Sequence, residues 1–462
     1  MIEYISLPFK LTAIEIFNQI RELGDAVLLD SCQPESQFGR YDIIAAAPDR
    51  KLRVNNQGTW IRGVSSSDWS LTQKEPFSIL NEWLEELKVP TDLQAPFNTG
   101  LIGSFSYDLG RHLEKLPSIS EADIHYPDLE IGRYLWAVVI DHHQQHSHLV
   151  YHSDWINSQD AERLVERLTQ PAHHAAERPK FKLNKPFISN LSAKRYADAL
   201  EKVDEYIHAG DVYQINFAQR FQSSFEGDPW QAWTALRRIA PTPYAAYIEN
   251  DQGAVLSLSP ERFLWCNAQG EVETRPIKGT RPRDSDPDLD LALQEELSNS
   301  EKDRAENLMI VDLLRNDLSK VCQPGSVKVP ELFSLETYPN VHHLVSSITG
   351  RLDKPFTPLD LLKHSFPGGS ITGAPKIRAM EIIDELEPHR RSIYCGSIAY
   401  ISACGYMNSS ITIRTLLCEQ QQIYCWAGGG IVADSDIASE YQETFNKVNN
   451  LLQNLEMHFL DF

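Results

Sequence analysis

The sequence lacks the features that would place the protein on a nucleic acid or in a membrane. Its net charge is −21 and it has no basic run, so a phosphate backbone or an anionic membrane surface would repel it. No apolar stretch approaches the length of a membrane span, and residues 1–17 lack the basic-then-apolar layout of a signal peptide. The seven cysteines are scattered without a CxxC pair. Such cysteines are typical of reduced thiols, which predicts a cytoplasmic protein.

Two glycine-rich runs lack the residues of a nucleotide-binding loop. In FPGGSITGAPK, 366–376, Gly373 is followed by Ala-Pro-Lys instead of Lys-Ser/Thr, which excludes a Walker-type site. A helix that begins near Pro375 could still hold an anion at its amide end. The second run, WAGGGIV, 426–432, predicts either a plain tight turn or backbone amides that are open to a carboxylate.

The length and composition are those of a globular protein with a large core. A chain of 462 residues, 42% hydrophobic and 23% charged, is expected to form roughly two or three domains. Residues 171–190 contain three prolines and little apolar periodicity, so they are the best linker candidate. We therefore expect an N-terminal region over 1–170, a linker over 171–190 and a second region over 191–456.

Strands and helices are mixed along the chain without a regular strand–helix–strand cycle. An amphipathic helix is predicted over 192–210, which Ser192 would cap and Gly210 would end. Further helices are expected at 301–320, 358–364, 375–387 and 438–456. Short apolar or alternating runs predict strands at 26–30, 41–47, 101–107, 134–141, 148–152, 212–221, 244–249, 254–260, 272–277, 397–402, 409–418 and 422–428. This mixture favours an α+β fold with antiparallel sheets.

Two residues next to predicted strands are candidates for catalysis. Lys278, in RPIKGTRPR, lies between a predicted strand and a Gly-Thr turn. A lysine in a turn is usually solvated, but it could attack carbon if burial or nearby positive charge kept it neutral. Glu261, in LSLSPERF, follows a proline at the end of a predicted strand. It is either a capping carboxylate or a general acid that protonates a leaving hydroxyl.

Two predicted helices each carry a pair of acidic residues on one face. Asp303 and Glu306 are three residues apart, as are Glu440 and Glu443, and Lys447 follows four residues later. A solvated face is the simpler interpretation of either helix alone. Two such faces that met would suit an oxygen-ligated, partly hydrated Mg²⁺.

These segments, taken in order through almost all of residues 190–455, resemble the chorismate-utilising enzymes. That family includes anthranilate, isochorismate, salicylate and aminodeoxychorismate synthases. The matching segments are SPERF, PIKGTRPR, KDRAENLMIVDLLRNDL, VHHLVS, PGGSITGAPK, ITIRT, and AGGGIVADSD with EYQETFNK. LLDS and RYDIIAAAP resemble the N-terminal part of the members that depend on a glutamine amidotransferase. The resemblance implies the fold of anthranilate synthase component I, a two-sheet α/β sandwich of mostly antiparallel strands with helices outside.

Within that family, Gln214 and Lys278 together resemble the branch that aminates chorismate at C4, the aminodeoxychorismate synthases. Anthranilate synthases carry Ala in place of Lys278, and isochorismate and salicylate synthases carry a water-activating lysine in place of Gln214. The resemblance implies that Lys278 attacks C2 of chorismate while Glu261 protonates the departing C4 hydroxyl. Ammonia would then add at C4 and expel the lysine. The expected product, 4-amino-4-deoxychorismate, leads to 4-aminobenzoate and folate.

The resemblance also implies the metal ligands and the substrate contacts. The Mg²⁺ ligands would be Glu306 and Glu443, with Asp303 and Glu440 in support through water. The C1 carboxylate of chorismate would be held by Mg²⁺, Lys447 and the amides of Gly428, Gly429 and Gly430. The enolpyruvyl carboxylate would be bound by Arg414 and Tyr400, and the ring by Gly279, Thr280, His343 and Thr372.

A second pocket is implied by a match to the tryptophan site of the family. The matching residues are Ser31, Phe38, Gly39, Arg40, Tyr41, Pro243, Tyr244 and Ala245. The chain has LLDS and TPYAAY where relatives usually have LLES and SPYMFY. We therefore expect tryptophan to be bound structurally or not at all.

The chain lacks the means to release ammonia from glutamine. It has no Cys-Gly-x-Gly segment with a distal His-x-Glu, so we do not expect it to hydrolyse glutamine. The resemblance implies a separate glutamine amidotransferase subunit that supplies ammonia, with free ammonia also serving. Two alternatives stay open. Anthranilate synthase component I would release anthranilate, and a non-catalytic chorismate- or tryptophan-binding regulator would bind without turnover.

Overall fold

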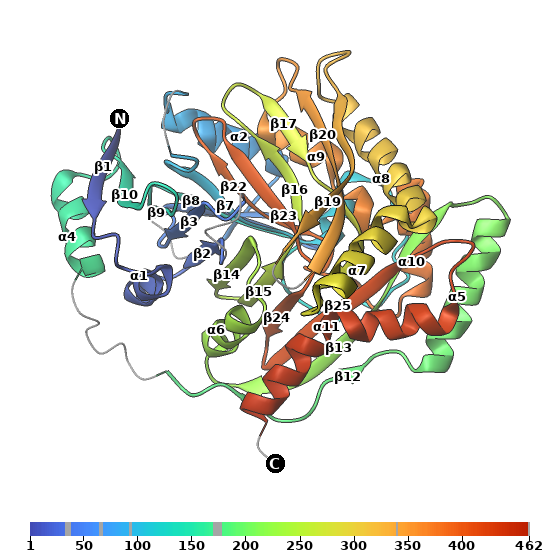
Figure 1. Ribbon diagram of the computed structural model, residues 1–462. Coiled ribbons are helices and arrows are strands. Elements are labelled where there is room, and N and C mark those ends of the chain that lie inside the picture. The colour runs from blue at the N-terminus through green and yellow to red at the C-terminus, as the bar shows by residue number, and fades with distance from the viewer. Residues whose placement is uncertain (33–37, 64–67, 92–94, 170–177, 339–340, 461–462) are drawn as a thin grey trace.

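Apolar residues on both faces of neighbouring strands build a two-sheet sandwich. The computed structural model describes residues 1–32, 38–63, 68–91, 95–169, 178–338 and 341–460. Within these ranges the strands form a 13-stranded and a 12-stranded sheet, and every strand ladder is antiparallel (Figure 1). The predicted α+β class with two mostly antiparallel sheets is confirmed.

The 13-stranded sheet has the spatial order β1-β10-β9-β3-β2-β14-β15-β24-β25-β13-β11, with β12 and β21 also paired to β13, within the described ranges. Its strands are β1 (Ile2–Leu7), β2 (Val27–Asp30), β3 (Tyr41–Ala45), β9 (Trp136–Asp141), β10 (His146–His152), β11 (Lys182–Leu183), β12 (Ile188–Ser189), β13 (Gln214–Glu226), β14 (Tyr244–Asn250), β15 (Gly253–Ser259), β21 (Gly373–Ala374), β24 (Thr415–Glu419) and β25 (Gln422–Ile431).

The 12-stranded sheet has the order β18-β20-β17-β16-β23-β22-β7-β8-β4-β5-β6, with β19 paired to β20, in the same part of the chain. Its strands are β4 (Arg50–Asn55), β5 (Gly58–Gly63), β6 (Ser70–Thr72), β7 (Gly100–Phe105), β8 (Leu129–Tyr134), β16 (Arg262–Cys266), β17 (Glu271–Thr274), β18 (Ile277–Pro282), β19 (Lys328–Thr337), β20 (Val341–Arg351), β22 (Ser397–Ser402) and β23 (Met407–Ile411).

The helices lie mainly on the outside of the sandwich. They are α1 (Ala13–Ile20), α2 (Pro76–Leu87), α3 (Gly110–Leu113), α4 (Ser158–Thr169), α5 (Ala193–His208), α6 (Pro229–Ile239), α7 (Pro287–Asn299), α8 (Glu301–Ser319), α9 (Pro358–Ser365), α10 (Lys376–Leu386) and α11 (Ile437–Phe459), with short 3-10 turns η1 (Arg21–Leu23), η2 (Tyr107–Leu109) and η3 (Gly369–Ile371). None of the helices in the described residues is long and apolar enough to cross a membrane.

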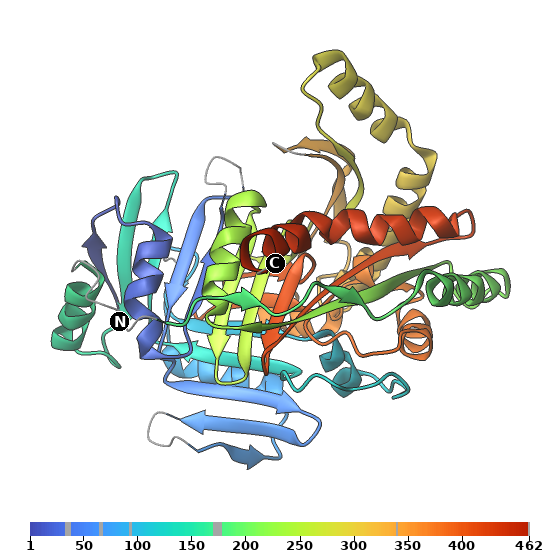
Figure 2. The same cartoon turned by 90° about the horizontal axis from the view of Figure 1, so that it is seen from below.

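The strand alternation explains why so many strands are apolar on both faces. Val27 and Ile43 point into the core between the two sheets, whereas their neighbours Leu28 and Ile44 point to the opposite face. On that outer face they pack against apolar residues of α1, α6 and α11. Figure 2 shows α6 and α11 beside each other across this side of the 13-stranded sheet. Both faces of this sheet are therefore buried.

Both sheets take strands from each side of the predicted linker. The 13-stranded sheet joins β1 to β3 with β13 to β15, and the 12-stranded sheet joins β4 to β8 with β16 to β20. Part of the linker, residues 170–177, lies outside the described residues, and the remainder runs along β13 as β11 and β12. The division of the chain into regions 1–170 and 191–456 therefore stays a prediction.

Two predicted strands have an interruption that their residue pattern does not reveal. The run 409–418 divides into β23 and β24, because Arg414 adopts a left-handed φ of 50° between them. Lys278 and Gly279 lie inside β18, so the predicted Gly-Thr turn is wrong. Ile277 pairs with Val345 and Thr280 with His343, so the β18–β20 register shifts between these pairs. That shift is a β-bulge.

Candidate active site

The acidic pairs lie in the first two turns of two capped helices, with Asp303 and Glu440 in the first turn of each. The Ser300 hydroxyl accepts a hydrogen bond from the Asp303 amide at 3.2 Å and begins α8. The Asp436 carboxylate accepts one from the Ser439 amide at 2.9 Å and begins α11. Helix amides stabilise negative charge in the first turn. The two caps therefore fix where the acidic side chains leave the backbone.

The glycine run lies in a strand and presents its backbone to the site. Gly428, Gly429 and Gly430 belong to β25 and pair with β13, so the plain tight turn is ruled out. The Gly428 carbonyl accepts a hydrogen bond from Lys447 Nζ at 2.8 Å, which shows that its peptide groups face away from β13. Peptide groups two residues apart along a strand face the same way, so those of Gly430 face the site as well.

Glycine is needed in this strand because carboxylates from both helices approach its backbone. A Cβ on Gly429 would lie 2.9 Å from Glu440 Oε2 and 3.7 Å from Glu443 Oε1. A Cβ on Gly430 would lie 3.5 Å from Glu306 Oε2. The acidic faces of α8 and α11 therefore meet at β25.

Positive side chains neutralise most of this acidic cluster. Glu440 pairs with Lys302 at 3.4 Å, and Glu443 pairs with Lys447 at 2.6 Å. Asp303 pairs with Arg281 at 3.2 Å. Glu306 makes no ion pair within the described part of the chain, and burial raises its pKa despite the nearby charges of Lys278 and Lys302. Carboxylate oxygens that are only partly compensated are the ligands that a partly hydrated Mg²⁺ prefers, although no three of these side chains have oxygens within 4.8 Å of one another.

The β-bulge in β18 turns Lys278 into the site. Gly279 follows it with a φ of 85°, and a Cβ there would lie 2.8 Å from Leu297 Cδ1 and 3.0 Å from Asp303 Cγ. Glycine is therefore the residue that both the backbone and the space allow. The Lys278 ammonium has no hydrogen bond or ion pair with the described residues.

The environment of Lys278 makes its amine less basic than that of a solvated lysine. Burial lowers the pKa of the amine, and the positive charge of Lys447 lowers it further, although Glu306, Glu261 and Glu443 act in the opposite direction. A neutral buried amine is a nucleophile, whereas an ammonium is not. The solvated lysine expected of an isolated turn residue is therefore excluded.

The environment of Glu261 favours its protonated form. The side chain is 5% exposed, and burial raises its pKa to about 7, against smaller opposing effects of Ser370 and Lys278. The Ser370 hydroxyl donates to Glu261 Oε1 at 3.0 Å. A carboxyl group that titrates near neutral pH can act as a general acid.

These groups share one cavity of about 390 Å³, which we call the main cavity. The predicted residues that line it are Glu261, Lys278, Gly279, Thr280, Asp303, Glu306, His343, Arg414, Gly428, Gly430, Glu440, Glu443 and Lys447. Segments far apart in the sequence thus converge on one site, as the order of motifs predicts.

The cationic end of the main cavity contains a buried arginine without an anion. The Arg414 guanidinium makes no ion pair or hydrogen bond with the described residues, and burial lowers its pKa. Next to it, burial and the charge of Arg414 lower the pKa of His343 to about 4. The neutral imidazole shares a hydrogen bond of 2.9 Å with the Thr280 hydroxyl. An uncompensated guanidinium in such a place suits a ligand carboxylate.

Three predicted contacts do not line the main cavity. Tyr400 lines a second cavity instead, so its predicted contact with the enolpyruvyl carboxylate is corrected. Thr372 is fully buried and its hydroxyl donates to the Gly368 carbonyl at 3.1 Å. The peptide of Gly429 belongs to the β13 ladder, because its two neighbours face the other way. Gln214 is also outside the lining, although its amide nitrogen would lie 1.9 Å from a Cβ on Gly430.

Ser370, Tyr394 and Trp426 are among the lining residues that the sequence reasoning missed. Ser370 lies in the PGGSITGAPK segment, where its spacing to Glu261 gives no sign of their contact. Tyr394 and Trp426 also line the main cavity, with parallel rings whose centroids are 6.1 Å apart. Trp426 could have been suspected from the sequence, because it directly precedes the AGGGIV segment that matches the family. Nothing in the sequence indicates Tyr394.

The second cavity has a volume of about 80 Å³ and lies at the predicted tryptophan site. Ser31, Phe38, Tyr41, Pro243, Tyr244 and Ala245 line it, whereas Gly39 and Arg40 do not. Arg40 instead pairs with Asp141 at 2.7 Å. The Ser31 hydroxyl is buried without a hydrogen-bond partner among the described residues.

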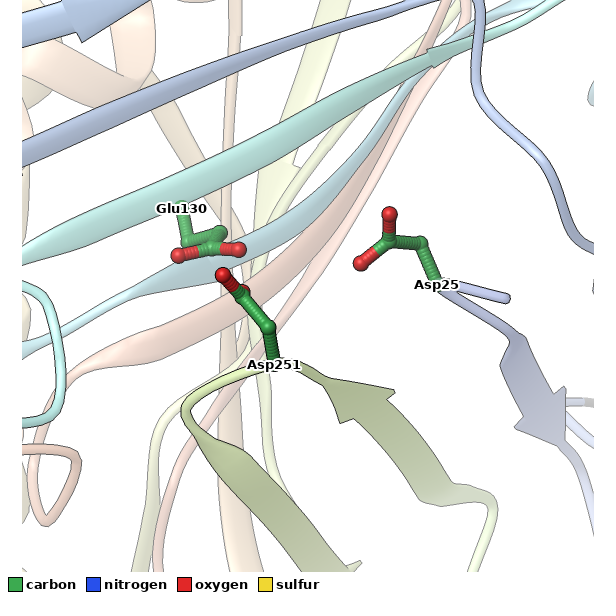
Figure 3. Close-up of side chains that lie close together, drawn as sticks. All are labelled: Asp25, Glu130 and Asp251. Atoms are coloured by element: carbon green, nitrogen blue, oxygen red, sulfur yellow. The ribbon is translucent and has the colours of Figure 1, made fainter. Parts of the chain in front are cut away.

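A separate cluster contains the carboxylates of Asp25, Glu130 and Asp251, which lie close together in Figure 3. Lys51 Nζ lies 2.6 Å from both Asp25 and Glu130, and Arg53 Nη2 lies 2.5 Å from Asp251. With Arg62 on Asp25, three cations balance three carboxylates. This neutral arrangement leaves no charge for a metal to compensate.

Comparison with known proteins identifies the family. The family model described as "chorismate binding enzyme" matches residues 25–453. The chain belongs to this family. "Aminodeoxychorismate synthase component 1" of Klebsiella aerogenes is 48% identical over 455 residues, which cover 98% of each chain. The protein of the same name from Escherichia coli K12 is 46% identical over 455 residues, again 98% of each chain.

A solved structure of the family has the same architecture. Anthranilate synthase component I from Streptococcus pneumoniae TIGR4 superimposes with a TM-score of 0.79 at 31% sequence identity. The superposition covers 90% of this chain and 93% of that one. The prediction that the chain has the fold of anthranilate synthase component I is therefore confirmed.

Proposed function

We propose that this chorismate-binding enzyme converts chorismate and ammonia to 4-amino-4-deoxychorismate. The observation that carries the proposal is the buried, unpaired amine of Lys278 in one cavity with the proton-holding Glu261. A C4-aminating enzyme needs C2 protected from ammonia, and a lysine that bonds to C2 provides that protection. The names and the high identity of the two aminodeoxychorismate synthase relatives support the same function.

The proposed reaction has two displacement steps. In the first, the neutral Lys278 Nζ forms a bond to C2, the ring double bonds shift, and the C4–O bond breaks. Glu261 gives its proton to the departing hydroxyl, which leaves as water, and then accepts the proton released by the new C2 amine. In the second, ammonia bonds to C4, the double bonds shift back, and the C2–N bond breaks. Glu261 returns a proton to Lys278 as it leaves and regains one from the new C4 ammonium, which becomes the amine of the product.

The acidic cluster and the cations would orient chorismate for these steps. Glu306 and Glu443 would hold Mg²⁺, with Asp303 and Glu440 in support, and the ion would supply positive charge to the C1 carboxylate. Arg414 would bind the enolpyruvyl carboxylate. This arrangement is supported by the carboxylate oxygens around β25 and by the unpaired guanidinium. Lys447, next to Gly428, would add a second positive group at the C1 end.

Ammonia would come from a glutamine amidotransferase subunit, since the term "component 1" in the names of the relatives indicates a partner component. Free ammonia should replace that subunit. A cytoplasmic location is supported by the seven cysteines, all of which are free thiols. The second cavity is our candidate for tryptophan. Tryptophan that raises the melting temperature of the wild type but not of Ser31→Phe would support this assignment, and an equal shift in both would oppose it.

The product distinguishes this function from its alternatives. The chain would be incubated with chorismate, Mg²⁺ and ammonium, and an aminodeoxychorismate lyase would then be added. We expect 4-aminobenzoate, whereas anthranilate that forms without the lyase would refute the proposal. A chorismate-binding regulator would yield neither. Glu306→Gln should weaken the dependence of the melting temperature on added Mg²⁺, which reports binding apart from turnover.

The covalent step has its own test. Chorismate without ammonia should leave an adduct on Lys278 of the trapped wild type, detected by mass spectrometry of peptides. Lys278→Ala should abolish it, and Lys328→Ala, which removes an exposed lysine of β19, should not. Turnover to 4-amino-4-deoxychorismate without any adduct on the wild type would refute the lysine intermediate and leave the product assignment intact.

A further inference from the structure

An ion pair that takes no part in the proposed reaction lies behind one wall of the main cavity. Arg391 and Glu387 follow helix α10, are 1% and 6% exposed, and do not line that cavity. Arg391 Nε and Nη2 donate to the two oxygens of Glu387 at 2.9 and 2.6 Å. A buried ion pair is by itself a poor source of stability, because the cost of removing both charges from water offsets their attraction. The other contacts of the pair are therefore informative.

The donors that Glu387 leaves free bond to the backbone of the cavity wall. Arg391 Nη1 donates to the Ile371 carbonyl at 3.0 Å, and Nη2 also donates to the Asn216 carbonyl. Both of these residues line the main cavity. The guanidinium also lies 5.6 Å from the ring centroid of Tyr394, which is another lining residue. Arg391 thus contacts wall residues that come from η3, from β13 and from the chain just before β22.

Ile371 is the neighbour of the serine that bonds to the proposed general acid. Ser370 and Ile371 both belong to η3, and the Ser370 hydroxyl donates to Glu261 Oε1 at 3.0 Å. A hydrogen bond requires a narrow range of distance and angle, so a small movement of η3 would weaken this one. Packing against α8 limits such movement, since a Cβ on Gly369 would lie 2.5 Å from Leu313 Cδ2. A hydrogen bond to the backbone carbonyl of the turn limits it further.

We propose that Arg391 is a positioning residue, which holds the η3 turn so that Ser370 bonds to Glu261. Its effect on the reaction rests on the proposed function, in which Glu261 protonates the departing hydroxyl. Arginine suits this role, because its planar fork can donate to a carboxylate and to backbone carbonyls at the same time. A lysine ammonium would keep the charge opposite Glu387 but has no fork to span all of these acceptors. The substitution Arg391→Lys therefore separates the ion pair from the positioning.

The pH dependence of adduct formation with chorismate alone tests the proposal. In Arg391→Lys the alkaline limb should move to higher pH, by at most the shift of about one unit expected for Ser370→Ala, because the serine bond holds down the pKa of Glu261. In the double variant the limb should move no further than in Ser370→Ala, since no hydroxyl remains to be positioned. Arg390→Lys is the matched control, because Arg390 donates to Ser118 at 2.6 Å and does not line the main cavity. Its pH profile should be that of the wild type.

Two results would overturn the proposal. The first is an alkaline limb of Arg391→Lys that stays in place or moves to lower pH, although thermal unfolding shows that the variant is folded. The second is a shift in the double variant equal to the sum of the two single shifts, which would mean that Arg391 acts independently of Ser370. Glu387→Gln loosens the guanidinium by removing its charged partner, and it replaces Arg391→Lys in the same comparison if that variant does not fold.

A failure of the proposed function has a different outcome. If the wild type forms no adduct, the lysine intermediate is refuted, whereas the positioning of Ser370 is still measurable without chorismate. Infrared titration of the Glu261 carboxyl band, identified by its absence from Glu261→Gln, reports the pKa of this group directly. We expect the band to titrate at higher pH in Arg391→Lys than in the wild type, and an unchanged titration would overturn the proposal.

Discussion

Replacing Ser370 by alanine should shift the pH dependence of adduct formation on Lys278. Glu261 has a pKa of about 7 because it is buried, and the Ser370 hydroxyl, which donates to it at 3.0 Å, holds that value down. A hydrogen bond to an ionised carboxylate is stronger than one to a neutral group by about 1.4 kcal/mol, which corresponds to about one pH unit. Losing the bond should therefore raise the pKa of Glu261 by that amount.

The sign of the shift follows from the role of Glu261 as an acid. The group must be protonated to expel the hydroxyl, so the rate falls as the pH rises through its pKa. In Ser370→Ala the alkaline limb should move to higher pH by about one unit, and the rate on the alkaline side should rise relative to the plateau.

Rapid quench with chorismate alone, followed by mass spectrometry of the Lys278 peptide, measures this step without ammonia. The steady-state rate would also depend on the fraction of neutral ammonia, which rises with pH while the fraction of protonated Glu261 falls. Ser370→Thr retains a hydroxyl and should keep the alkaline limb close to that of the wild type. An alkaline limb that stays in place or moves to lower pH in Ser370→Ala would refute this account of Glu261.

Three further substitutions test other parts of the structure. Glu261→Gln should raise the free energy of unfolding by about 3 kcal/mol above neutral pH and change it little below pH 4.5, as urea unfolding would measure. The reason is that the pKa of Glu261 is 4.5 in the unfolded chain and about 7 in the folded one, so the cost of burying the ionised carboxylate grows between these two values. Gly430→Ala should lower kcat/KM for chorismate by about tenfold or more, since its Cβ would lie 1.9 Å from Gln214 Nε2. Gly63→Ala is the control: its Cβ has no atom of the described residues within 4 Å, so its kinetics should be those of the wild type. Lys51→Met should lower the free energy of unfolding by about 3 kcal/mol, because two carboxylates at 2.6 Å lose their partner, and a stability equal to that of the wild type would contradict the ion-pair account.

Helices were the elements that the sequence predicted best, because their ends carry local chemistry. The helix predicted over 192–210 is α5, whose Ser192 cap accepts a hydrogen bond from the Arg195 amide at 3.3 Å. Gly210, just beyond the helix, has a φ of 81°, as a terminating glycine requires. These signals act within a few residues. They need no knowledge of what the helix packs against.

The strand interruptions could not be predicted, because the apolar pattern continues through them. ITIRT alternates as one strand would, yet the chain turns at Arg414 to pass from one sheet to the other. The bulge at Lys278 likewise depends on how β18 is paired with β20, which lies more than sixty residues later. Register between distant strands is a tertiary property. Most of the residues that the family pattern predicts line the main cavity, but Tyr400 lines the second cavity instead.

Burial is the main cause of the pKa shifts of both reacting groups. In water at neutral pH, a lysine is a cation that cannot attack and a glutamate is an anion that cannot donate a proton. Desolvation penalises the charged form of each, so it lowers the pKa of Lys278 and raises that of Glu261 in the same cavity. If the two groups instead formed an ion pair, both would be held in the wrong protonation state. Among the described residues the Lys278 amine has no ion-pair partner and the carboxyl has a serine, so the two opposite pKa shifts come mainly from burial. The function of this site therefore requires a local loss of stability, which the gain predicted for Glu261→Gln would measure.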